Sequence, residues 1–193
     1  MTIIEAIHDE NLFRKFFRDL ATWNSWFVVL RAIFGLPMND EELAVFQMLT
    51  ARVTPPTAQT KEAWFIIGRR GGKSFIVALI AAYLACFRDY RPYLGPGERA
   101  VIMVIATDRK QARVIMRYLQ ALLEHVPMLA AMIEKIGSES VDLNNNVSIE
   151  ITTCSHRSVR GYTIVAALCD EIGFWRSEES ANPAEEILQI GKP

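Results

Sequence analysis

Residues 68–74, Gly-Arg-Arg-Gly-Gly-Lys-Ser, decide the fold expected for this chain. They follow a short apolar run at 63–67 (AWFII) and lead directly into a long apolar run at 75–87 (FIVALIAAYLACF). A glycine-rich turn between a strand and a helix lets backbone N–H groups close round phosphate oxygens, and the helix N-terminus adds the positive end of its dipole. In such a loop the Lys73 ammonium neutralises the β- and γ-phosphates, and the Ser74 hydroxyl ligates Mg²⁺. The stretch therefore predicts a site for the phosphates of a nucleotide.

The loop departs from the strict GxxxxGK[ST] pattern (Walker A) at one position. The first glycine of that pattern falls on Ile67, and Gly68 leads the loop instead. Besides the lysine and the serine, the residues expected to bind the nucleotide are Gly68, Arg70, Gly71 and Gly72. The alternative is a glycine turn that precedes a helix and binds no ligand.

Apolar runs of strand length alternate with longer helical runs around the loop. The periodicity predicts strands at 63–67, 100–106, 141–143, 147–152 and 164–169, and helices at 73–88 and 108–125. Asp108 stands at the start of the second helix, and Asn144-Asn145-Asn146 suit a hairpin turn because asparagine tolerates positive φ. Strands that alternate with helices imply a parallel sheet with right-handed crossovers. We expect an α/β domain with a central, mainly parallel sheet flanked by helices.

The N-terminal part of the chain has a different pattern. Aromatic and leucine side chains recur every three or four positions from Phe13 to Leu30, which is the period of an amphipathic helix. Gly35 ends this run, and Asp40 can cap a second helix that extends to about Thr50. Packing of the aromatic side chains in a core is the favoured interpretation, and an exposed stripe that docks on a partner is the alternative.

Composition supports a folded domain and gives no global sign of a polyanionic partner. The 193 residues are 51% apolar, which is ample for a hydrophobic core, and 21 basic against 22 acidic side chains leave a net charge of −1. The charge is unevenly distributed, at −2 for residues 1–67, +5 for 68–160 and −4 for 161–193. Any nucleic acid or anionic membrane must therefore be met by a local patch.

Cysteine use indicates a reducing compartment, and the lengths of the apolar runs bear on membrane contact. Cys86, Cys154 and Cys169 are odd in number and widely spaced, without metal-ligand spacing to a histidine, so we expect reduced thiols in the cytoplasm. The N-terminus lacks the basic start and the cleavage site of a secretory signal. The longest apolar stretch, 75–87, has 13 residues against the ~20 that span a bilayer, so we expect no membrane partner.

An acidic pair, Asp170-Glu171, ends the predicted strand at 164–169. Nucleotide hydrolysis needs a metal-supporting acid and a water-activating base on a strand near the phosphate loop. Asp170 can hold Mg²⁺ through its water ligands, and Glu171 can orient and deprotonate the attacking water. Surface exposure is the alternative interpretation of an acidic pair, and the upstream loop favours the functional one.

Nucleotide hydrolysis also needs a positive group near the γ-phosphate, and an arginine can supply it because a guanidinium stabilises the charge that spreads over the γ-phosphate oxygens. Arg69 and Arg70 lie inside the loop, and Arg157 and Arg160 lie in the turn before the acidic strand. Each alone could be a solvated surface charge, but their positions on both sides of the expected γ-phosphate favour a catalytic role.

Together these features resemble the large terminase subunit of tailed bacteriophages. The resemblance rests on the loop GRRGGKS at 68–74, on Arg160-Gly161 ahead of a strand ending CDEIGFW, and on Phe46-Gln47 upstream. Residues 106–112 also look like the family's second strand and following helix. The resemblance implies a P-loop NTPase fold of the ASCE (RecA-like) class. It also implies an ATPase motor that packages viral DNA into procapsids, with ATP and Mg²⁺ as cofactors.

The same resemblance implies roles for three further residues and a set of partners. In the family pattern Gln47 contacts adenine, Arg69 is the arginine that such loops carry early, and Arg160 is an arginine finger offered in trans to the next subunit. The implied partners are a homo-oligomeric ring, a portal, a small terminase subunit, and double-stranded DNA that a lone subunit binds weakly. The implied location is the bacterial host cytoplasm, at the procapsid.

The chain departs from the family at its C-terminal end. Terminase large subunits continue to a coupling motif and an RNase H-like nuclease domain. We therefore expect an N-terminal helical segment (1–40), an incomplete ATPase domain (41–193) and no nuclease activity. A helicase-like ATPase is less favoured, because Ile172-Gly173 replace the DEAD or DEAH continuation. A truncated, non-hydrolysing nucleotide-binding module is the remaining alternative.

Overall fold

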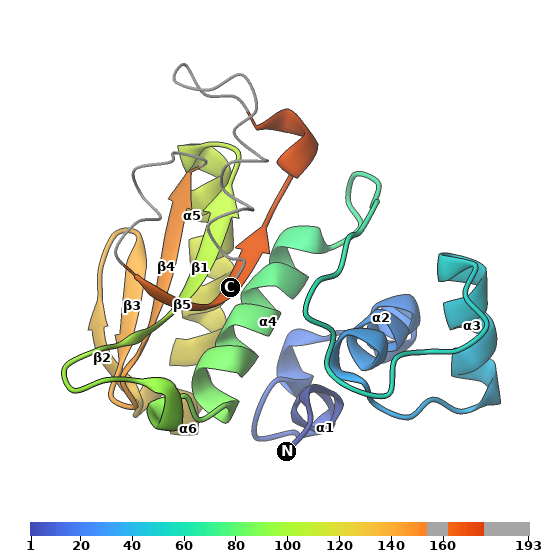
Figure 1. The fold of residues 1–193 in the computed structure, drawn as a ribbon, viewed down its shortest axis with the longest axis horizontal. Coiled ribbons are helices and arrows are strands. Elements are labelled where there is room, and N and C mark those ends of the chain that lie inside the picture. Colours follow the sequence, from blue (N-terminus) through green and yellow to red (C-terminus); the bar gives the residue numbers. More distant parts are fainter. Residues whose placement is uncertain (154–161, 176–193) are drawn as a thin grey trace. The chain divides into compact units, whose positions relative to one another are not determined.

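The computed structural model describes residues 1–153 and 162–175 and divides the chain into two compact units (Figure 1). The first unit is Met1–Arg69 and the second is Arg70–Pro193. The predicted division of the chain at residue 41 stays a prediction.

The first unit is helical. Its elements are α1 (Ile3–His8), the short 3-10 helices η1 (Arg14–Phe16) and η2 (Leu20–Trp23), α2 (Asn24–Phe34) and α3 (Asp40–Thr50). Gly35 ends α2 with a φ of 63°, and a side chain at this position would collide with the backbone of Ala58. Asn39 caps α3 in a capping box with Glu42, one residue ahead of the predicted cap at Asp40.

The amphipathic helix predicted over residues 13–30 is wrong for most of its length. The chain turns out of helical geometry at Phe17 and again at Asp19, whose carboxylate accepts a hydrogen bond from the N–H of Ala21. The apolar period nevertheless reports burial, since Phe13, Phe17 and Leu30 are buried. Core packing of these side chains is therefore confirmed, although short turns rather than one helix provide it.

The strand predicted at 63–67 is also wrong. This segment has no regular secondary structure, and Trp64, Phe65 and Ile66 are exposed. An apolar run reports a preference for burial, but a strand also needs a neighbouring strand for its N–H and C=O groups. None of the described strands pairs with this segment.

The second unit is built on one sheet, whose described strands run in the order β2, β3, β4, β1, β5 (Figure 1). These strands are β1 (Ala100–Ala106), β2 (Ile133–Ile136), β3 (Ser140–Leu143), β4 (Val147–Thr153) and β5 (Thr163–Cys169). β1 lies parallel to both β4 and β5, whereas β2, β3 and β4 pair antiparallel. Asn146, at the end of the β3–β4 turn, has a φ of 63°, as the asparagine run predicted. β2 was not expected from the sequence.

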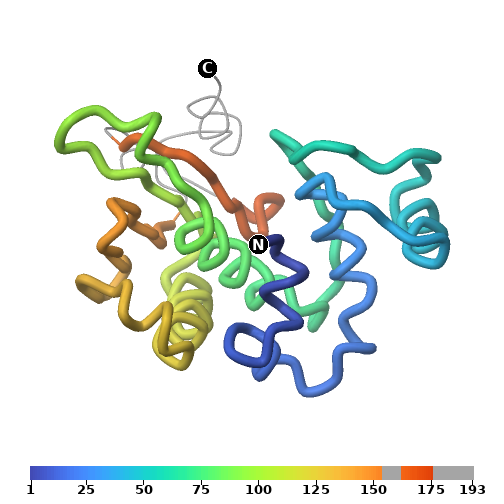
Figure 2. Tube along the Cα trace, turned by 90° about the horizontal axis from the view of Figure 1, so that it is seen from below, coloured from blue at the N-terminus to red at the C-terminus, as the bar shows by residue number. Residues whose placement is uncertain are grey.

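Two long helices accompany the sheet. α4 (Lys73–Phe87) and α5 (Arg109–Glu124) pack on each other, and both contact β1 and β4 (Figure 2). The shorter elements are η3 (Arg91–Tyr93), α6 (Pro127–Ala130) and η5 (Ile172–Phe174). The predicted mixed α/β architecture and both long helices are confirmed.

Candidate functional site

Two residues of the glycine-rich loop ahead of α4 have left-handed backbone. Arg70 has a φ of 62° and Gly72 a φ of 78°, and α4 begins at Lys73. Gly72 occupies the N-cap and has no side chain that could accept from the N–H groups of the first turn. Left-handed residues in such a turn direct successive N–H groups to one concave side, and the helix dipole adds positive potential there. The loop thus has the backbone form of an anion site.

The acidic pair is held at the C-terminal end of β5. Asp170 is buried, its N–H donates to the carbonyl of Ile105 at 2.8 Å, and its own carbonyl accepts from Nε1 of Trp175 at 2.9 Å. Trp175 is anchored in a core cluster with Met103 and Ile105 of β1. Glu171 follows with a φ of 56°, a left-handed conformation that turns the chain sharply after the strand.

One ion pair and one bridging amide join the loop to the acidic pair. Lys73 Nζ lies 2.9 Å from Glu171 Oε1, and both side chains are partly exposed. Gln111 Nε2 donates to Ser74 Oγ at 2.8 Å and to Asp170 Oδ2 at 2.9 Å. Residues far apart in the sequence therefore meet at one end of the sheet, as predicted for the lysine, the serine and the two acids.

Gln111 is a member of this site that the sequence did not single out. It lies in the first turn of α5, where the Asp108 carboxylate caps the helix by accepting from the N–H groups of Lys110 and Gln111 at 2.7 and 2.9 Å. A usable signal was present, because α5 starts directly after β1. β1 and β5 are parallel neighbours, so the residues that follow each strand lie at the same edge.

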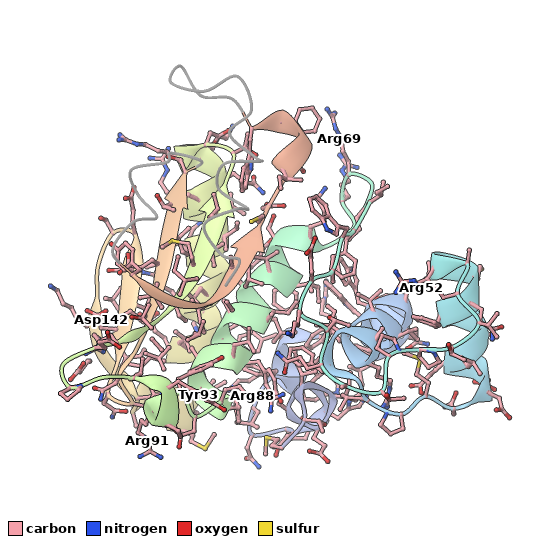
Figure 3. All side chains as sticks on the ribbon, in the orientation of Figure 1. Arg52, Arg69, Arg88, Arg91, Tyr93 and Asp142 are labelled. Atoms are coloured by element: carbon pink, nitrogen blue, oxygen red, sulfur yellow. The ribbon has the colours of Figure 1, made fainter. Side chains whose placement is uncertain are left out.

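The other predicted site residues lie in the first unit or outside the described residues. Gly68 and Arg69 end the first unit, and the Arg69 side chain is exposed (Figure 3). Gln47 is exposed on α3, where its Nε2 donates to the carbonyl of Val53 at 3.0 Å. Arg157 and Arg160 lie outside the described residues. The roles expected for these side chains stay predictions.

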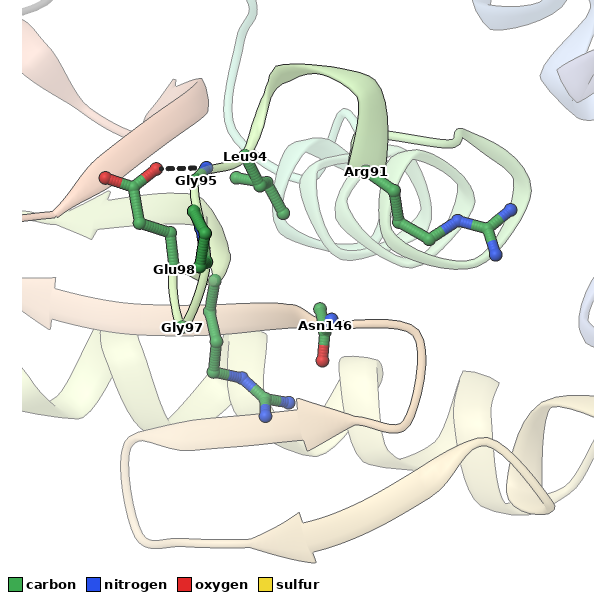
Figure 4. A pocket seen from close by; sticks show the side chains of 8 residues that line it. Arg91, Leu94, Gly95, Gly97, Glu98 and Asn146 are labelled. Carbon is green, nitrogen blue, oxygen red and sulfur yellow. Dashed lines mark hydrogen bonds between the residues drawn. The ribbon is translucent and has the colours of Figure 1, made fainter.

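A hollow of about 480 Å³ lies at the other end of the sheet (Figure 4). It is lined by residues 94–99 together with Arg91 and Asn146. Its two arginines already have acidic partners, Arg91 with Asp89 at 2.8 Å and Arg99 with Glu134 at 3.1 Å. Hydrogen bonds from Arg91 lower the pKa of Asp89 to about 2. Both guanidinium groups of the hollow are thus held by carboxylates in the ligand-free chain.

The described thiols do not suit metal or nucleophilic chemistry. Burial raises the pKa of Cys86 to about 12 and that of Cys169 to about 11, so neither forms a thiolate at neutral pH. Among the described residues, no three His, Cys, Asp or Glu side chains gather into a group that could hold a metal ion. Within the same part of the chain, no helix is long and apolar enough to cross a membrane.

Comparison with known proteins adds a family to this geometry. A family model described as terminase large subunit, T4likevirus-type, N-terminal, matches residues 64–186, which is more than half of the chain. The matched span contains the loop, Gln111 and the acidic pair. No curated protein matches the chain. The resemblance seen in the sequence is confirmed: residues 64–186 match the N-terminal domain of the family, and the chain belongs to the T4likevirus-type terminase large subunit family.

Proposed function

We propose that the chain is an ATPase motor domain that binds MgATP at residues 68–74 and hydrolyses it with the help of Asp170 and Glu171. Membership of the terminase large subunit family supports a role in phage DNA packaging. The single observation that carries the proposal is the meeting of Lys73 with Glu171, and of Ser74 with Asp170 through one shared amide group. We further propose that the sheet, the loop and the two long helices form a P-loop NTPase fold of the ASCE (RecA-like) class.

Phosphate binding follows from charge and backbone form. The left-handed residues Arg70 and Gly72 and the start of α4 present N–H groups to an anion, and Lys73 adds a full positive charge. In the proposed complex, Lys73 exchanges its partner Glu171 for the β- and γ-phosphate oxygens. Gly71 lies within the same turn and contributes backbone to it.

The donor set at Ser74 and Asp170 fits magnesium, because this ion prefers hard oxygen ligands: the Ser74 hydroxyl can bind it directly, and the Asp170 carboxylate can hold it through its water ligands. Too few acidic side chains are near for an all-protein metal cage among the described residues, so the phosphates of the nucleotide complete the set. When bound, Mg²⁺ neutralises charge that develops on the phosphate oxygens. Asp170, held rigidly by Ile105 and Trp175, fixes the position of its carboxylate toward this site.

Glu171 is the proposed general base. Its carboxylate lies beside the Lys73 ammonium, which places it near the position proposed for the terminal phosphate. A carboxylate there can accept the proton of an attacking water. Arg160 in trans and Arg69 in cis are the proposed guanidinium groups for transition-state charge, and Gln47 is the proposed adenine contact.

The proposed partners follow the family. They are double-stranded DNA, a ring of identical subunits, a portal and a small terminase subunit in the host cytoplasm. DNA affinity of the lone chain should be low and should fall steeply with salt. The basic excess of residues 68–160 is only +5, and part of it serves the nucleotide.

Phosphate release from MgATP tests the proposal. Lys73→Ala and Glu171→Ala should each lower turnover by about 10²- to 10⁴-fold, since each removes a group that acts on the reacting phosphate or water. Matched controls are Lys135→Ala and Glu124→Ala, which remove exposed charges on β2 and α5 and should leave turnover unchanged.

Two outcomes would contradict the proposal. Tight ATP binding without turnover at any protein concentration would indicate a non-hydrolysing nucleotide-binding module. Turnover that survives both Lys73→Ala and Glu171→Ala would place the chemistry elsewhere.

A further inference from the structure

The Gln111 side chain occupies the space between the two proposed magnesium-facing oxygens. Its single amide nitrogen donates to Ser74 Oγ at 2.8 Å and to Asp170 Oδ2 at 2.9 Å. Both hydrogens of the amide are used in these contacts. An amide NH₂ group is a donor without acceptor capacity, so it cannot itself ligate a cation.

The amide group presents positive charge to the same two oxygens that a bound cation would face. The amide hydrogens carry partial positive charge and face a hydroxyl oxygen and a carboxylate oxygen. The buried Asp170 carboxylate needs such a donor when no cation is present, because an unpartnered buried charge is costly.

We propose that Gln111 is a positioning residue that stands in for the metal: its NH₂ group holds Ser74 and Asp170 together in the ligand-free site and withdraws when the metal binds. This inference rests on the proposed magnesium–nucleotide site. The backbone of Gln111 is fixed, since its N–H donates to the Asp108 cap at 2.9 Å. Withdrawal therefore takes place by rotation of the side chain, and it links occupation of the metal site to the first turn of α5.

Two substitutions have opposite expected effects. Gln111→Met keeps the length of the side chain and removes both donors, so binding of the metal no longer competes with the bridge. Gln111→Lys puts a full positive charge beside Asp170 and strengthens the competition. A purely structural role of Gln111 would move both variants in the same direction.

The experiment measures binding of a fluorescent, non-hydrolysable ATP analogue to the whole chain, once with Mg²⁺ and once with EDTA. The dissociation constant in EDTA divided by the dissociation constant in Mg²⁺ reports how much the metal contributes to binding, without any turnover. For Gln111→Met this ratio should increase by about ten- to thirtyfold, the equivalent of two net hydrogen bonds. Gln111→Lys should lower it. Gln120→Met, the same change at a partly exposed position of α5, should leave it unchanged.

The outcomes separate this inference from the proposed function. An unchanged or smaller ratio in Gln111→Met, or a larger one in Gln111→Lys, overturns the stand-in role while nucleotide binding remains. If the unaltered chain binds no nucleotide in either buffer, the proposed function itself is refuted, and the stand-in role with it. Circular dichroism of each variant establishes that the helices are intact before the ratios are compared.

Discussion

Replacing Glu171 by glutamine should separate nucleotide binding from hydrolysis. In the ligand-free chain the Glu171 carboxylate pairs with Lys73 Nζ at 2.9 Å, so the lysine must leave this partner before it can bind phosphate. Glutamine has nearly the same size but no charge. The substitution therefore removes the contact of Lys73 with this carboxylate, and the proposed general base with it, in one step.

The magnitude follows from the exposure of the pair. Lys73 and Glu171 side chains are 23% and 33% exposed, so solvent screens the pair and it is worth about 1 kcal/mol. Loss of this competing contact should tighten ATP binding by about fivefold. Hydrolysis should fall by about 10²- to 10⁴-fold, because no group then accepts the proton of the water.

Calorimetric titration with a non-hydrolysable ATP analogue gives the affinity, and phosphate release gives the turnover. Lys73→Met alone should weaken binding, and adding Glu171→Gln to Lys73→Met should bring no further gain, since the pair is already broken. Glu134→Gln, which breaks the ion pair with Arg99 at 3.1 Å, is the control and should change neither quantity. Weaker or unchanged binding by Glu171→Gln would refute the competition between glutamate and phosphate.

Three further predictions concern other parts of the chain. Specific activity should rise with protein concentration, and mixing Arg160→Ala with Glu171→Ala subunits should restore some turnover; absence of rescue counts against a shared site. Gln47→Ala should weaken ATP more than GTP in competition titrations, whereas equal losses would remove the adenine assignment. Burial and neighbouring carboxylates raise the pKa of Glu150 above its usual 4.5, so the ionised form destabilises the folded state at neutral pH. Glu150→Gln should raise the melting temperature at pH 7.5, and the gain in unfolding free energy should be less than about 1 kcal/mol because the group is only half-buried. Below pH 4 the substitution should bring no gain, and a gain that persists there contradicts the assignment.

Local sequence was sufficient for the elements of the second unit that have clear start signals. Asp108 caps α5 where the sequence placed a helix start, and β1 runs from Ala100 to Ala106 as its apolar run predicted. The meeting of Lys73 with Glu171 was expected from a strand ahead of the loop, and it occurs although residues 63–67 form no strand.

Long-range partners were what the sequence could not provide. The apolar run at 63–67 reads as a strand, yet strand formation depends on a neighbour that the run itself does not specify. The aromatic period from Phe13 to Leu30 predicted burial correctly and helix length incorrectly, because local turns at Phe17 and Asp19 interrupt it. Gln111 was not predicted as a site residue, because its role depends on contacts with two side chains that are distant in the sequence.

A structure of the chain with Mg²⁺ and a non-hydrolysable ATP analogue tests the central claim most directly. We expect the triphosphate against residues 70–74, with Lys73 Nζ on a phosphate oxygen in place of Glu171. We also expect the metal between Ser74 and Asp170, with the Gln111 amide withdrawn from that position. A nucleotide bound elsewhere on the chain, or a triphosphate in the loop with Lys73 still paired to Glu171, would contradict the account.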